Sequence, residues 1–123
     1  MPQSPEFAAV FKDLRAVLAR YEAKLKVVRD QPDHYYLDTF TIGPNKRPIM
    51  FGAVRIHKNY VSYYLMSVYG QTALLDGMSP ELRKHMQGKA CFNFKAPDAK
   101  LISELAAITK KGYAVWKKME WVE

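Results

Sequence analysis

The stretch that decides the fold runs from residue 35 to residue 69 and reads YYLDTFTIGPNKRPIMFGAVRIHKNYVSYYLMSVY. It contains three runs rich in aromatic and β-branched residues, the composition preferred in β-strands, at residues 35–42, 49–57 and 60–69. The turn-forming segment GPNKRP separates the first two runs, and Lys58-Asn59 separates the last two. Connections this short join antiparallel neighbours, since a parallel crossover needs more chain. The stretch therefore predicts a three-stranded antiparallel meander.

An amphipathic helix is expected before the meander. Its apolar residues recur at helical spacing and fall within about 120° of one another on a helical wheel. Ser4 is expected to cap the start of this helix, and Pro32 forbids its continuation. The apolar positions are Phe7, Val10, Phe11, Leu14, Val17, Leu18, Tyr21 and Leu25.

The chain after the meander predicts two helices and one more strand. A short helix is expected over residues 80–87. Residues 89–95 then alternate in polarity, which places Phe92 and Phe94 together on one face of a fourth strand. A long amphipathic helix should begin at Asp98 and run toward the C-terminus.

The expected order of elements is α-β-β-β-α-β-α, within a single domain over residues 1–123. This order predicts the α+β class, with an antiparallel sheet of about four or five strands. The N- and C-terminal amphipathic helices should pack on one face of that sheet. Gly112 lies in the middle of the last helix, where it either breaks the helix or allows close packing against the sheet.

Composition and charge bound the function. The 123 residues carry a net charge of +7, which favours solubility and attraction to anionic partners. The single cysteine cannot form an internal disulfide, and the N-terminal residues lack the basic and apolar regions of a signal peptide. No apolar run approaches the roughly 18 residues that a membrane span needs. We therefore expect a cytoplasmic protein without a membrane partner.

Candidate catalytic and metal-binding groups are sparse. His34, His57 and His85 are isolated, and no pair of them has a metal-ligand spacing. Cys91 is the only thiol, and a nucleophilic role would require a neighbouring base or positive field. A structural cysteine is the favoured interpretation, with a Cys91-dependent enzyme as an alternative. The sequence predicts no catalytic residue, metal site or cofactor.

A binding surface on the sheet is the main functional hypothesis. Both faces of the third predicted strand are apolar or aromatic, so a face left uncovered by helices would expose tyrosines. That face would bind a small molecule or a second copy of the chain. Nucleic-acid binding is the alternative, because bases stack on aromatic side chains beside basic groups, although no RNP-type signature is present. The residues expected on this face are Phe51, Tyr63, Cys91 and Asn93.

Several segments from Tyr60 onward resemble the YdhG-like domain family of bacterial proteins, and the first half of the chain resembles it more loosely. The most specific block is MQGKACFNFK at residues 86–95. The segments YVSYYLM and LLDGMSPEL, at residues 60–66 and 74–82, also carry the resemblance. The resemblance implies a compact sheet with helices on one side, in agreement with the pattern of the residues.

One branch of that family is described as frataxin-like, which would imply delivery of iron for cofactor assembly. Such a role needs a ridge of acidic residues, because hard cations prefer clustered oxygen ligands. The first predicted helix carries only Glu6, Asp13 and Glu22, interleaved with lysine and arginine. A frataxin-like iron carrier is therefore a disfavoured alternative.

Overall fold

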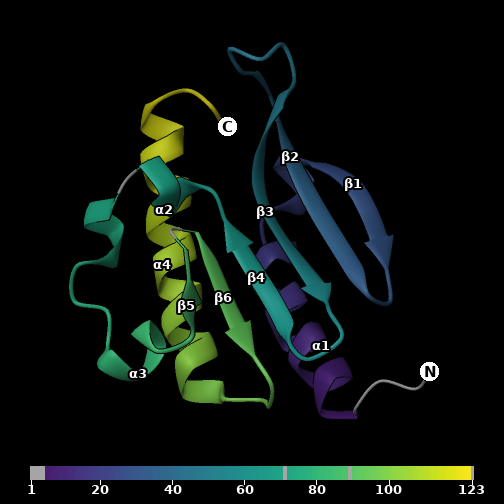
Figure 1. Cartoon of the computed structure of the whole chain (residues 1–123). Helices are drawn as coiled ribbons and strands as arrows, with labels where there is room; N and C mark the ends of the chain where they lie inside the picture. The colour runs from purple at the N-terminus through teal and green to yellow at the C-terminus, as the bar shows by residue number, and fades with distance from the viewer. Residues whose placement is uncertain (1–4, 71, 89, 123) are drawn as a thin grey trace.

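The computed structural model describes residues 5–70, 72–88 and 90–122. The chain folds into a six-stranded antiparallel sheet with two long helices packed against one face (Figure 1). The strands lie in the order β1-β2-β3-β4-β6-β5. Their bounds are β1 Lys26–Gln31, β2 His34–Ile42, β3 Pro48–Ile56, β4 Val61–Leu65, β5 Met86–Gln87 and β6 Cys91–Phe94. The helices are α1 Pro5–Ala19, α2 Ser67–Gly70, α3 Pro80–Arg83 and α4 Ala99–Lys118, with 3-10 turns η1 Glu22–Lys24 and η2 Thr72–Leu75. The predicted α+β class and its terminal helices are confirmed.

The sheet has six strands rather than the predicted four or five, because two edge strands were not expected. β1 pairs antiparallel with β2, and β5 pairs antiparallel with β6. All six residues of β1 are exposed, so no alternation of buried and exposed positions marks it in the sequence. β5 contains only two residues. Both strands form through pairing with a neighbour, which local sequence signals do not report.

Helix α1 ends at Ala19, earlier than its apolar stripe suggests. The last two apolar residues of that stripe, Tyr21 and Leu25, lie on either side of the turn η1 and still contact the core. Leu25 is buried, and the centroid of the Tyr21 ring lies 5.7 Å from that of the Phe51 ring. The proposed cap at Ser4 lies outside the described residues.

Helix α4 begins as expected, because the Asp98 carboxylate accepts a hydrogen bond from the Leu101 backbone N–H at 3.1 Å. Gly112 lies inside this continuous helix. A Cβ at position 112 would lie 2.1 Å from the Ser67 Oγ, so the glycine allows close approach of α2 rather than of the sheet.

The core lies between the sheet and the two long helices. Tyr63 is fully buried, and its hydroxyl lies 2.6 Å from the Thr109 Oγ1 on α4. Phe51 is fully buried against Trp116, with ring centroids 5.8 Å apart. Phe92 and Phe94 lie on the same covered face, as predicted, since they pair with Tyr63 and Val61 of β4.

The prediction that Phe51 and Tyr63 lie on the uncovered face is wrong. Tyr63 pairs directly with Phe92, so the two side chains share the helix-covered side of the sheet. Phe51 is displaced by a β-bulge: Leu37 pairs with Gly52 but Asp38 pairs with Met50, which leaves Phe51 as an extra residue. The bulge turns Phe51 toward the helices, where regular alternation would have pointed it away.

Candidate ligand-binding face

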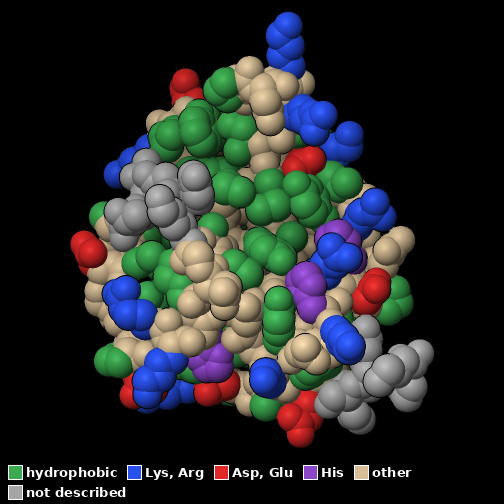
Figure 2. All heavy atoms as spheres, viewed as in Figure 1, with side chains coloured by type: hydrophobic (Ala, Val, Ile, Leu, Met, Phe, Trp, Pro, Cys, Tyr) green, Lys and Arg blue, Asp and Glu red, His purple; other side chains and the backbone are tan. Residues whose placement is uncertain are grey.

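None of the helices that the structure describes covers the side of the sheet opposite α1 and α4, and we call this side the open face (Figure 1). Strand register decides which side chains lie on it, because successive residues alternate between the two faces. Figure 2 shows apolar side chains at its centre, with lysine and arginine side chains around its edge and histidine side chains at the right and at the bottom of the view. The residues placed there are Lys26, Arg29, His34, Tyr36, Asp38, Met50, Ala53, Arg55, Ser62, Tyr64, Cys91 and Asn93.

Two tyrosines form the centre of the open face. Tyr36 and Tyr64 both pair with Ala53, one from each side, so the three side chains form a row across β2, β3 and β4. Ala53 is only 2% exposed although its side chain is small, because its larger neighbours cover it. Both tyrosines are partly exposed. They form an aromatic surface that water and ligands can reach.

Histidine and a further tyrosine extend this row toward the β3–β4 turn. The His57 Nε2 lies 3.2 Å from the Tyr64 hydroxyl. The His57 ring also contacts the Tyr60 ring, with centroids 5.1 Å apart. The hydrogen bond fixes the Tyr64 hydroxyl, and the ring contact places Tyr60 at the end of the same aromatic surface.

Asn93 is held by two neighbours on the open face. The Ser62 hydroxyl donates a hydrogen bond to the Asn93 Oδ1 at 2.6 Å, and the Cys91 thiol donates to the same oxygen at 3.3 Å. Both donors satisfy the amide oxygen, so the amide NH₂ points away from them. Within the described parts of the chain this NH₂ has no hydrogen-bond partner. It is an oriented donor available to a ligand.

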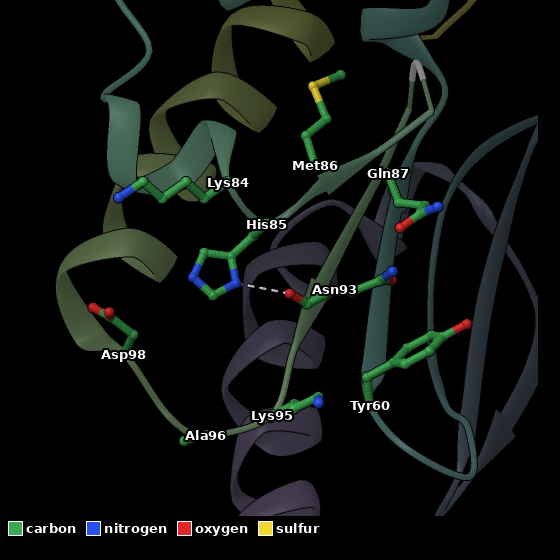
Figure 3. Close-up of a pocket in the computed structure, with 9 residues that line it drawn as sticks. All are labelled: Tyr60, Lys84, His85, Met86, Gln87, Asn93, Lys95, Ala96 and Asp98. Carbon is green, nitrogen blue, oxygen red and sulfur yellow. Dashed lines mark hydrogen bonds between the residues drawn. The ribbon is translucent and has the colours of Figure 1, made fainter.

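A pocket of about 530 Å³ adjoins Asn93, where β6 leads into α4. In Figure 3, Asn93 and Lys95 point from β6 toward Tyr60, while His85 lies on the opposite side of that strand. The pocket walls are rich in hydrogen-bond donors, because lysines and side-chain amides contribute to them. The lining residues are Tyr60, Lys84, His85, Met86, Gln87, Asn93, Lys95, Ala96 and Asp98.

His85 supports the pocket wall. Its Nδ1 lies 2.8 Å from the Asn93 backbone carbonyl, so this nitrogen carries the proton and donates. Its ring stacks on Phe94 with centroids 4.6 Å apart. The Asp98 carboxylate is engaged as the helix cap described above, which leaves lysine and amide donors as the principal polar groups for a ligand.

The open face is positively charged at neutral pH. Burial lowers the pKa of His34 and of His57, and the positive charge of Arg55 lowers each further, so both rings favour the neutral form. Burial raises the pKa of Asp38, and its Oδ1 has no hydrogen-bond partner in the described chain. The charged residues that register places on the face are the cations Lys26, Arg29 and Arg55 and the carboxylate of Asp38. The adjoining pocket adds Lys84 and Lys95 and the carboxylate of Asp98.

Of the four residues predicted on this face, Cys91 and Asn93 lie there and Phe51 and Tyr63 do not. The residues that sequence reasoning missed include Tyr36, Tyr64 and Ser62, which occupy the row and network just described. Tyr64 could be placed only from the register that pairs Tyr63 with Phe92, which puts its neighbour Tyr64 on the open face. Ser62 could not, because its contact with Asn93 joins residues 31 positions apart.

Cys91 has the properties of a structural thiol. Burial raises the pKa of the Cys91 thiol, whereas an activated nucleophile needs a lowered pKa. Its thiol is a hydrogen-bond donor to Asn93, which again uses the protonated form. Within residues 5–70, 72–88 and 90–122, no group of three or more His, Cys, Asp or Glu side chains could hold a metal ion.

Comparison with protein-family models, with curated proteins and with solved structures finds no match for this chain. The resemblance to the YdhG-like domain family therefore stays a prediction. Among the helices that the structure describes, none is both long enough and apolar enough to cross a membrane.

Proposed function

We propose that this protein is a non-catalytic binding domain that holds an anionic ligand on its open face. The observation that carries the proposal is the oriented amide of Asn93, whose oxygen accepts two hydrogen bonds and which lines a pocket together with Lys84, Gln87 and Lys95. A donor held in this way selects a ligand with an exposed acceptor, because the amide cannot turn without breaking two hydrogen bonds. The pocket volume lies within the usual range for ligand sites, roughly 300–1,000 Å³.

The charge of the face supports an anionic ligand over a second copy of the chain. A two-fold contact through the open face would bring the same surface patch from each copy together. Each copy would then place Arg29 and Arg55 against a face that carries the same positive charge. Opposed cations cost free energy at an interface, whereas an anionic ligand is attracted to them.

The other candidate functions have less support. The raised pKa of the Cys91 thiol opposes a thiol-dependent enzyme. A frataxin-like iron carrier would need clustered carboxylates, and Asp38 is the one carboxylate placed by register on the open face. We also propose that the domain acts in the cytoplasm, since its one cysteine has no partner for an internal disulfide.

Native mass spectrometry of the purified protein, compared with its denatured mass, tests the proposed function. We expect a non-covalent adduct that is lost on denaturation and is depleted in the Asn93→Asp variant. An aspartate keeps the acceptor for Ser62 and Cys91 but replaces the NH₂ donor with negative charge.

The matched control is Asn45→Asp, which makes the same charge change in the β2–β3 turn. Asn45 uses its Oδ1 to accept a hydrogen bond from the Arg47 backbone N–H, and an aspartate can replace it. We expect this control to retain the adduct. A bare wild-type monomer, a dimer as the sole complex, or an adduct equally retained by Asn93→Asp would each overturn the proposal.

A further inference from the structure

We infer that the ligand of the open face is single-stranded nucleic acid, a conclusion that rests on the proposed function. The first observation is the row of aromatic side chains across the sheet, in which Ala53 separates Tyr36 from Tyr64. Tyr36 and Tyr64 are two strands apart, or roughly 10 Å at the backbone. His57 links Tyr64 to Tyr60, so aromatic rings continue from β2 to the turn before β4. Bases of any identity can stack on such rings.

The spread of positive charge favours a polymer over a single nucleotide. Lys26 and Arg29 lie on β1, Arg55 lies on β3, and Lys95 follows β6 at the pocket. Four strand spacings separate β1 from β6 in the sheet order, which is about 19 Å at ~4.8 Å each. One phosphate group cannot contact both ends of that span. A nucleic-acid strand can span it, because it carries one phosphate on every nucleotide.

The exposed aromatic surface favours a single strand over a duplex. Stacking on a tyrosine requires an unpaired base with a free face, and the bases of a duplex are already stacked on one another. The Asn93 NH₂ would then donate to a carbonyl or ring-nitrogen acceptor on a base near the pocket. Arg55 lies beside this aromatic row, since it pairs with His34 on β2 and with Ser62 on β4. Arg55 is therefore placed to contact the phosphate of a base stacked on Tyr64.

Fluorescence anisotropy with a labelled thymidine oligonucleotide of about twelve nucleotides tests the inference, a length within the usual range for single-strand binding domains. Titrations between 50 and 200 mM salt should give a slope of about −3 in log affinity against log salt, for four cations at ~0.7 each. The Tyr64→Ala variant should bind about 5- to 150-fold more weakly, the usual effect of losing one aromatic side chain on which a base stacks.

Two variants with the same charge change separate a specific contact from general attraction. Arg55→Gln removes a cation from the open face and should lower the magnitude of the salt slope by about 0.7. Lys111→Gln removes a cation from the exposed side of α4 and should change neither affinity nor slope. Equal weakening by the two variants would overturn the inference, because the protein would then bind through its net charge alone.

Two further ligands test the class of nucleic acid. If thymidine monophosphate displaces the oligonucleotide at an equal nucleotide concentration, the ligand is a single nucleotide and the inference of a polymer is wrong. Equal affinity for a duplex of the same length would show that the inference of a single-stranded ligand is wrong. If the oligonucleotide does not bind but native mass spectrometry shows an adduct lost in Asn93→Asp, the nucleic-acid inference fails and the proposed function stands.

Discussion

The hydrogen bond between Tyr63 and Thr109 gives a sharp test of which face of β4 the helices cover. The Thr109 hydroxyl donates to the Leu105 backbone carbonyl at 2.8 Å, so the Tyr63 hydroxyl must donate to the Thr109 oxygen. In Thr109→Val, the buried tyrosine donor has no acceptor, which costs about 1–3 kcal/mol of unfolding free energy. In Tyr63→Phe, Thr109 keeps its bond to Leu105, so the cost is smaller, about 0.5–1.5 kcal/mol.

The double variant makes the test quantitative. Tyr63→Phe with Thr109→Val leaves no unpaired donor, so it should be more stable than Thr109→Val alone. Urea unfolding followed by tryptophan fluorescence measures all three variants. Tyr64→Phe, on the open face, is the control: it removes a hydrogen bond to His57 that water can replace, so it should cost less than Tyr63→Phe. The assignment of faces would be refuted if Tyr64→Phe cost more than Tyr63→Phe, or if Thr109→Val cost nothing.

Three other predictions address packing, charge and pH. Gly112→Ala should destabilise the protein by about 1–3 kcal/mol in urea unfolding, because the new Cβ would lie 2.1 Å from the Ser67 Oγ. Adding Ser67→Gly to this variant should restore most of the lost stability. A Gly112→Ala variant more stable than the wild type would contradict this packing. Asp38→Asn should leave the melting temperature at pH 7 unchanged or higher, since it removes a carboxylate whose pKa is raised by burial. The same variant should bind the oligonucleotide more tightly, because it removes a negative charge from the open face. Weaker binding would count against the charge argument. Because the pKa values of His34 and His57 are lowered in the folded state, the unfolded chain takes up protons first as pH falls below about 6.5. Stability should therefore decline from pH 6.5 toward pH 5 in thermal melts, and it should decline less when both histidines are replaced by glutamine; an equal decline would exclude this cause.

The meander and the last helix were predictable because their signals are local. Aromatic and β-branched runs separated by turn residues mark β2, β3 and β4, and Asp98 marks the start of α4 through its capping side chain. Strand β1 was missed because its sequence, KVVRDQ, follows directly on the stripe of the first helix and alternates neither in polarity nor in burial. Its strand conformation depends on pairing with β2, which a local pattern does not contain.

The candidate site was predicted only in part, for similar reasons. Asn93 and Cys91 were placed correctly because the alternation of Phe92 and Phe94 fixes the facing of β6. Phe51 was misplaced because the bulge in β3 reverses its facing without any signal in the sequence.

The contacts that turn Asn93 into an oriented donor come from residues distant along the chain. Ser62 lies on β4, and the pocket beside Asn93 combines the β3–β4 turn with the segment between α3 and α4. Sheet pairing brings these segments together, so spacing along the sequence could not reveal the site.

The most direct test of the open face as a binding surface is an amide NMR titration with an unlabelled thymidine oligonucleotide. The Asn93 side-chain NH₂ resonances should shift most, together with backbone amides of β3, β4 and β6. The amides of Lys110 and Lys111 on the exposed side of α4 should stay in place. Shifts concentrated on α4, or an Asn93 side chain that does not respond while other residues do, would contradict the account.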